Sequence, residues 1–242
     1  MFWRDVEMKP FSSFTLKIMA ITFMVMDHVY TYLAAHLNGA VPIWVGYLGK
    51  LAAPIFFYLV VEGFYETRSR GKYMQRILAM GILMIGVGLI LGIHNNIFLS
   101  LGLGLVMLSF IEYARAHEKG SKGFILGVIV STLFGLLSLF TETSIHGIVM
   151  IVIFYFLREK KMLMSIVYVI FSLFGLLFFI GPTLRESIFL WDYQWMMVFS
   201  IIPILMHNGK VGVASKFVKK IFYWFYPIHL IVIVVLSKVI VG

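Results

Sequence analysis

The chain contains no cysteine, which excludes disulfide bonds, thiolate nucleophiles and zinc sites with cysteine ligands. Charge is also scarce: 13% of the 242 residues are charged, whereas a soluble domain has about 25%. Apolar residues take their place, at 61% of the chain against about 45–50% in a soluble domain. This composition predicts a membrane protein with several spanning helices and excludes a separate soluble catalytic domain.

Nine apolar runs are long enough to be considered as membrane spans. We therefore expect an all-α, polytopic helical bundle of about nine transmembrane helices, forming one domain over residues 1–242. The sixth run is short, so it is expected to be tilted, re-entrant or paired with its neighbour. The runs lie at 14–35, 46–65, 77–93, 97–113, 123–140, 144–157, 163–180, 188–206 and 221–239.

The basic residues are distributed asymmetrically between the two sides of this bundle. Seventeen of the twenty Lys and Arg fall on one side, against Lys50, Arg185 and Lys238 on the other. Positive charge collects in cytoplasmic loops, so the asymmetry predicts a multi-pass plasma-membrane protein with a cytoplasmic N-terminus. It also accounts for the net charge of +9 without nucleic acid, because basic loops face anionic lipid headgroups. The seventeen are Arg4, Lys9, Lys17, Arg68, Arg70, Lys72, Arg76, Arg115, Lys119, Lys122, Arg158, Lys160, Lys161, Lys210, Lys216, Lys219 and Lys220.

Ionisable groups inside spans are costly, so they are the first candidates for function. Those inside the predicted spans are Asp27, His28, Lys50, Glu62 and His229, and polar groups near the outer ends are His94, Asn95, Asn96, Glu142, His146 and Asp192. The alternative is that some of them only connect helices through polar contacts. The adjacent pair Asp27–His28 favours function, because two ionisable neighbours deep in one helix are hard to justify structurally.

The first predicted helix places Lys17 and His28 on one face. They are eleven residues apart, which returns to within about 20° of the same direction and gives a rise of about 16 Å. A lysine at the cytoplasmic end of the helix and an imidazole deeper in the membrane suit a long anionic thioester. Its phosphates would bind the lysine while its thioester end reaches the imidazole. Asp27 points about 100° away from His28. We therefore expect the carboxylate that orients His28 to come from another helix, with Glu62 as one candidate.

The second predicted span carries Lys50, Pro54, Tyr58 and Glu62 at every fourth position, which makes one stripe kinked at Pro54. Glu62 also lies near the cytoplasmic end of this span. An ion pair with Arg68 is therefore an alternative to a catalytic role.

The ninth predicted span contains Tyr226, Pro227 and His229. A proline inside a span is tolerated where the freed backbone groups line a polar cavity or pack on protein. His229 lies about 12 Å along the helix from Ile221, a depth comparable to that of His28. Two histidines at this depth on different helices indicate a site.

Four segments together resemble the TraX family of membrane proteins. They are LKIMAITFMVMDHV at 16–29, GKLAAPIFFYLVVEGFYETRSRGKYMQRI at 49–77, NNIFLSLGLG at 95–104 and YPIHL at 226–230. The named member of the family acetylates the N-terminal amine of a conjugative pilin. The family pattern usually has arginine where this chain has Lys50. The spacing of Lys17 and His28 also resembles the arginine–histidine signature of the wider membrane acyltransferase-3 family, with lysine in place of arginine.

The resemblance implies an acetyl-CoA-dependent acetyltransferase. His28 would be the general base or transient acetyl carrier, supported by Asp27, Glu62 and His229, and no metal would be needed. Lys17, Arg68, Arg70, Lys72 and Arg76 would bind the phosphates of acetyl-CoA. Lys50, Tyr58, Asn95 and Tyr226 would contact substrate, and one of these hydroxyls or amides would stabilise the oxyanion.

The acceptor is expected on the membrane or extracytoplasmic side, as a peptide amine, a glycan or a small molecule. The alternative function is a proton-coupled transporter or flippase, because Asp, Glu and His inside spans also make proton relays. The chain shows no internal repeat of the kind that many transporters have.

Overall fold

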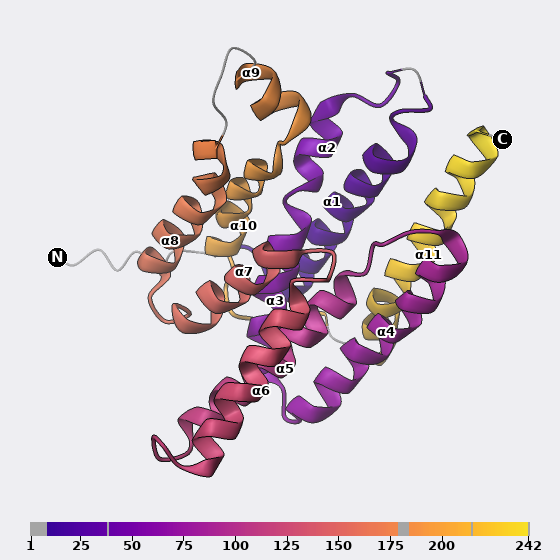
Figure 1. Ribbon diagram of the computed structural model, residues 1–242. Coiled ribbons are helices and arrows are strands. Elements are labelled where there is room, and N and C mark those ends of the chain that lie inside the picture. The colour runs from indigo at the N-terminus through magenta and orange to yellow at the C-terminus, as the bar shows by residue number, and fades with distance from the viewer. Residues whose placement is uncertain (1–8, 38, 179–183, 214, 242) are drawn as a thin grey trace. The chain divides into compact units, whose positions relative to one another are not determined.

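The computed structural model describes residues 9–37, 39–178, 184–213 and 215–241. Within these ranges every regular element is a helix, which confirms the all-α prediction, and Figure 1 shows their order. In the described residues, β-type backbone hydrogen bonding is limited to an isolated bridge between Phe11 and His207. Arg4, which we expect on the cytoplasmic side, lies outside the described residues.

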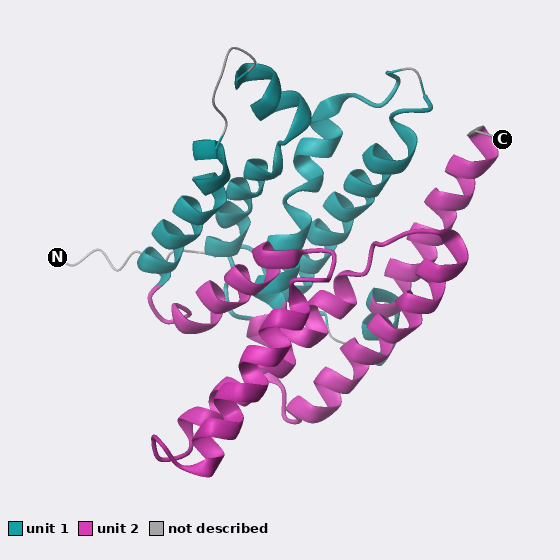
Figure 2. Cartoon of the chain, in the orientation of Figure 1, with its two compact units in different colours: residues 1–59, 161–222 teal, residues 60–160, 223–242 magenta. Residues whose placement is uncertain are grey.

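The helices form two compact units, which are coloured separately in Figure 2. Unit 1 is Met1–Leu59 with Lys161–Phe222, and unit 2 is Val60–Lys160 with Tyr223–Gly242. Helices α3 (Ala52–Glu66) and α11 (Lys216–Val241) carry residues of both units. The other elements of unit 1 are α1 (Ser13–Leu33), α2 (Ile43–Gly49), α8 (Lys161–Phe174), η1 (Gly175–Phe178), α9 (Leu184–Glu186), η2 (Ser187–Trp191), η3 (Gln194–Ser200) and α10 (Ile201–Leu205). Those of unit 2 are α4 (Arg70–Leu91), α5 (Ile97–Arg115), α6 (Lys122–Ser138) and α7 (Ser144–Phe156).

Several helix ends are set by single residues. The Ser12 side chain accepts the backbone N–H of Thr15 at 3.2 Å and caps α1, and Asn96 does the same for Leu99 at 3.1 Å in α5. Gly92 ends α4 in the left-handed region, at φ 71°, which glycine adopts without steric cost. These three helix ends are therefore fixed by a polar or glycine residue at the end of an apolar run.

Five segments are long and apolar enough to cross a membrane, and a sixth joins them if the bent pair Leu184–Trp191 and Gln194–Leu205 is one span. This makes the chain a multi-helix membrane protein. Helices α6 and α7 are apolar but shorter, with 17 and 13 residues, and α1 is not among the five. The total of nine spans and the side of the N-terminus remain predictions. The five are Ile43–Glu66, Arg70–Leu91, Ile97–Arg115, Lys161–Phe178 and Lys216–Ile240.

The second predicted span is broken four residues before its proline. Helix α2 ends at Gly49 and α3 begins at Ala52, so Lys50 and Leu51 lie in the break. Pro54 explains the position, because a proline ring clashes with the carbonyl four residues earlier, which here belongs to Lys50. The expected kink at Pro54 is therefore displaced to Lys50.

In unit 2, α4 and the carboxyl-terminal part of α11 run side by side (Figure 1), and Lys238 Nζ donates to the Leu91 carbonyl at 2.7 Å. Pro227 lies inside α11, and the helix continues through it to Val241. Helices α5 and α6 also pack closely, since a Cβ on Gly127 would lie 2.7 Å from the Ala114 Cβ.

Candidate functional site

In unit 1, Asp27 of α1 forms an ion pair with Lys50, whose Nζ lies 2.8 Å from Asp27 Oδ1. About a quarter of each side chain is exposed. The Lys50 ammonium also lies 5.5 Å from the centre of the Tyr193 ring, a cation–π distance. Lys50 can reach Asp27 because Gly49 packs directly on the Asp27 backbone. Two predicted site residues are thus brought together, and Tyr193 is a neighbour that the sequence did not indicate.

His28 is buried, with 2% of its surface exposed. It shares the buried stripe of α1 with Leu16, Ala20 and Met24, and its ring meets that of Tyr32 edge to face at 6.4 Å between centroids. An imidazole at such a position on an apolar helix is costly unless it is used or hydrogen-bonded. Because Asp27 binds Lys50, the carboxylate next to His28 in sequence is directed to a cation.

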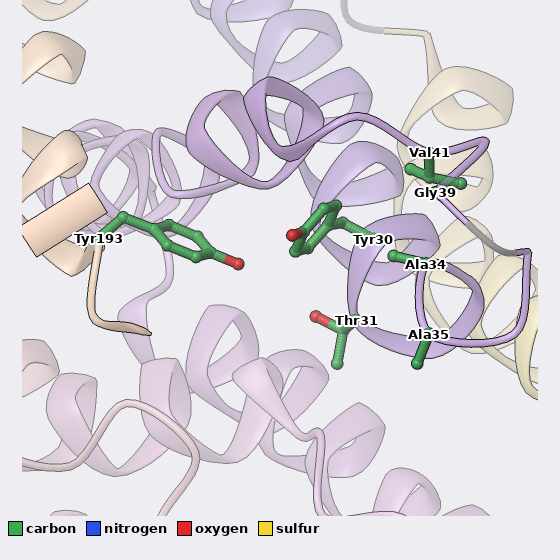
Figure 3. Close-up of a pocket in the computed structure, with 7 residues that line it drawn as sticks. All are labelled: Tyr30, Thr31, Ala34, Ala35, Gly39, Val41 and Tyr193. Carbon is green, nitrogen blue, oxygen red and sulfur yellow. The ribbon is translucent and has the colours of Figure 1, made fainter. Parts of the chain in front are cut away.

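Unit 1 contains a cavity of about 510 Å³ that adjoins the Asp27–Lys50 pair through Tyr193, which lines the cavity and contacts Lys50. In Figure 3 the Tyr30 and Tyr193 hydroxyls point toward one another across it, and their rings meet edge to face at 6.1 Å between centroids. Tyr193 therefore contributes both to the cavity wall and to the contact with Lys50. The full lining is Tyr30, Thr31, Ala34, Ala35, Gly39, Val41 and Tyr193.

Tyr58 belongs to a second polar chain in unit 1. Its hydroxyl lies 3.0 Å from Nδ1 of His207, and Nε2 of His207 lies 3.0 Å from Ser13 Oγ. Lys161 Nζ donates to the Tyr58 hydroxyl at 3.4 Å. Tyr58 and His207 are both buried. His207 is a site residue that the sequence did not indicate, because it stands in a loop whose evident feature is its lysines.

Lys17 lies near the start of α1, where its Nζ sits 5.7 Å from the centre of the Phe222 ring. It is close enough to Lys219 for the two positive charges to repel each other. This crowding of positive charge within unit 1 is compatible with the predicted anion-binding role of Lys17.

In unit 2, Glu62 forms a two-pronged ion pair with Arg158. Arg158 Nε donates to Glu62 Oε1 at 2.9 Å and Nη2 to Oε2 at 3.2 Å. The same guanidinium lies 3.6 Å from Glu66 and 2.7 Å from Glu159. The hydrogen bond to Glu62 raises the pKa of Arg158, so this cation stays charged. The helix-end ion pair considered for Glu62 therefore exists, with Arg158 as the partner and not Arg68.

The predicted phosphate-binding cations of unit 2 differ in their surroundings. Arg70 forms an ion pair with Glu112 and donates to the Phe64 carbonyl at 3.1 Å. Its guanidinium is therefore used within the protein. The other three, Arg68, Lys72 and Arg76, are exposed.

A further polar cluster in unit 2 is centred on Glu142. Its carboxylate accepts the Asn96 backbone N–H at 2.5 Å, the Asn95 side-chain amide at 3.3 Å and the Tyr226 hydroxyl at 3.4 Å. The His229 ring meets the Tyr226 ring at 5.7 Å between centroids. Two predicted site residues, Asn95 and Tyr226, thus bind the Glu142 carboxylate, and a third, His229, packs against the Tyr226 ring.

The tautomer of His229 follows from its backbone contact. Its Nδ1 lies 2.8 Å from the Phe225 carbonyl oxygen, which can only accept, so Nδ1 carries the proton. The neutral ring therefore has its lone pair on Nε2. This is the form that a general base requires.

A bundle of apolar helices with charged and imidazole groups on their buried faces defines a polytopic membrane protein with an internal polar site. The chain belongs to the TraX family, whose model (described as TraX protein) matches residues 12–237. It is also 25% identical over 241 residues to the probable fimbrial assembly protein FimC, serogroup H1, of Dichelobacter nodosus, covering 91% of this chain and 93% of that protein. No solved structure gives a significant match. The family predicted from the four sequence segments is confirmed.

Proposed function

We propose that this protein is an integral membrane acetyltransferase that moves an acetyl group from cytosolic acetyl-CoA to an amine. The observation that carries the proposal is the burial of His28, at 2% exposure, on an apolar helix beside the Asp27–Lys50 ion pair. Membership of the TraX family supports the reaction. The similarity to a protein named for fimbrial assembly supports, as acceptor, the free N-terminus of a fibre subunit.

In the proposed reaction His28 acts as the general base. An amine that arrives as ammonium must lose a proton before it attacks the thioester carbonyl, and a neutral imidazole is suited to take that proton near pH 7. The new C–N bond forms as the C–S bond breaks. The proton held by His28 passes to the departing sulfur, so that CoA leaves as the thiol. The acylated nitrogen then loses its second proton to the neutral imidazole, which releases it to solvent, so that each transfer yields one free proton and a neutral histidine.

The surrounding charges support this task. The Asp27 carboxylate is one residue from His28 and would offset part of the charge of a transient imidazolium through space, while its ion pair with Lys50 fixes its position. Two separate sets of cations are candidates for the phosphates of acetyl-CoA: Lys17 in unit 1, and the exposed Arg68, Lys72 and Arg76 in unit 2. Arg70 is the weaker candidate because Glu112 already binds it.

The test is a transfer assay with the purified protein in detergent. The protein is incubated with acetyl-CoA labelled in the acetyl group and with a short apolar peptide whose N-terminus is either free or formylated. We expect label on the free peptide and none on the formylated one. If no amine or hydroxyl acceptor gains label, and neither acetyl-CoA nor CoA raises the melting temperature, the acetyltransferase proposal is wrong and the transporter alternative is favoured.

A further inference from the structure

In unit 1 the first turns of α1 and α11 lie against each other and bring lysines together. The Phe14 and Phe222 rings meet edge to face at 5.8 Å between centroids, and Lys17 Nζ lies 5.7 Å from the centre of the Phe222 ring. Lys17 is partly buried, and it is near enough to Lys219 for their positive charges to repel each other. Two further exposed lysines share one side of α11 with Lys219, because they are spaced by three and four residues. The lysine cluster is Lys17, Lys216, Lys219 and Lys220.

The positive charge of the lysine cluster is not balanced by neighbouring acidic residues. Residues 9–26, which surround Lys17, and residues 193–242, which contain the other three lysines, have no Asp or Glu. Among the described residues, none of the four lysines forms an ion pair. Like charges held together without a counter-ion repel each other, and more strongly where one of them is partly buried. An anion bound at the cluster would remove this cost.

The lysine cluster lies at the end of an apolar segment. The segment Lys216–Ile240, which is long and apolar enough to cross a membrane, begins at the first lysine of α11. In a membrane these ammonium groups would therefore stand at the level of the phosphate headgroups, with their carbon stems along the apolar surface. Exposed apolar side chains adjoin the lysines on both helices, because Ile18 is 46% exposed, Phe217 72% and Ile221 45%. A ligand that suits both features carries a phosphate at one end and a hydrocarbon chain at the other.

We infer that the lysine cluster is a specific binding site for the phosphate headgroup of an anionic membrane lipid, with an acyl chain along Ile18 and Ile221. Basic pockets between helices at a membrane surface bind anionic headgroups in this way. CoA also carries phosphates, but it has no hydrocarbon chain to cover the exposed apolar side chains. The site is independent of the proposed function, and it leaves Arg68, Lys72 and Arg76 as the cations for acetyl-CoA.

The experiment measures lipid binding by native mass spectrometry of the purified, delipidated protein in a neutral detergent. The protein is titrated with dioleoylphosphatidylglycerol, which is anionic, or with dioleoylphosphatidylcholine, which has the same chains and a zwitterionic headgroup. The intensities of the free and lipid-bound peaks give the Kd of the first bound lipid. We expect phosphatidylglycerol to bind about tenfold or more tightly than phosphatidylcholine, because each lysine near an anionic headgroup contributes about fivefold to affinity.

A double variant with a matched control locates the site. Lys17→Gln with Lys219→Gln removes two charges from the lysine cluster and should weaken phosphatidylglycerol binding about tenfold or more, with little change for phosphatidylcholine. Lys119→Gln with Lys122→Gln removes two exposed charges between α5 and α6, and this protein should bind phosphatidylglycerol as the parent does. If the first double variant does not fold, Lys219→Gln with Lys220→Gln takes its place with the same expected loss, since both positions are exposed.

Three results would overturn the lipid site. Equal affinity for the two lipids would show that the headgroup charge is not recognised. The same loss of affinity in the cluster variant and in the Lys119–Lys122 control would show only a general attraction to positive surface. Displacement of phosphatidylglycerol from the parent protein by excess CoA would reassign the lysines to acetyl-CoA. Binding that survives excess CoA and is lost in the cluster variant supports the site, whether or not the protein transfers acetyl groups.

Discussion

Gly49 of α2 lies so close to Asp27 of α1 that a Cβ atom on Gly49 would be 2.6 Å from the Asp27 Cα and 2.8 Å from its backbone nitrogen. The two helix backbones are therefore in contact at this level. Small residues allow such close approach between helices in membranes. The contact brings Lys50, the next residue, to the Asp27 carboxylate, so a glycine without any polar group sets the geometry of the charged pair.

Gly49→Ala should destabilise the protein by about 1–3 kcal/mol, because the added methyl group meets backbone that cannot rotate away. Gly86→Ala is the matched control: it lies on α4, where a Cβ would meet nothing within 4 Å, and alanine should leave stability unchanged or slightly raised. Thermal unfolding in detergent, followed by loss of helical signal, measures both. Equal melting temperatures for the two variants would show that α1 and α2 can separate without cost.

Removing the Glu62 carboxylate should lower the stability of the protein more than it lowers the acetyl-transfer rate. Glu62→Gln and Arg158→Met each break the same ion pair and leave a partly buried charge, so we expect both to lower the melting temperature and the amount of folded protein to a similar degree. The acetyl-transfer rate per folded molecule should change by less than about tenfold in each, which is below the usual effect of losing a general base. A much larger rate loss in Glu62→Gln than in Arg158→Met would return Glu62 to a catalytic role.

The absence of native cysteine makes the topology directly testable. We expect Gly71→Cys and Lys119→Cys to be protected from a membrane-impermeant maleimide added to intact cells, and His36→Cys to react. All three positions are exposed in the structure, so each thiol is accessible to reagent on its own side. All three should react after the cells are opened. Reaction of Gly71→Cys in intact cells would contradict the predicted cytoplasmic side of the basic loops.

The all-helical class was predictable because the signals for a helix are local. Apolar runs of helical length are visible in the sequence, and the caps Ser12 and Asn96 and the terminating Gly92 lie at the helix ends that they determine. The break at Lys50 was misplaced by four residues, because the steric effect of Pro54 acts on the preceding turn.

The partners of the site residues were much less predictable. Glu62 and Arg158 are 96 positions apart, and Tyr58 and His207 are 149 apart, so no spacing rule connects them. The sequence indicated which side chains were costly in a membrane, but the nearest cation in sequence, Arg68, was the wrong partner for Glu62. The pairing depends on which helix faces meet, and apolar runs that are hydrophobic on all sides carry little information about that.

The central claim is that His28 is the general base, and single-turnover acetyl transfer by purified variants tests it most directly. His28→Gln keeps a polar side chain but has no basic nitrogen. His36→Gln makes the same change at an exposed position just beyond α1. We predict that His28→Gln lowers the transfer rate by about a hundredfold or more while the melting temperature and the affinity for CoA stay close to those of the parent, and that His36→Gln transfers normally. A folded His28→Gln protein that transfers acetyl within about tenfold of the parent rate would contradict the mechanism.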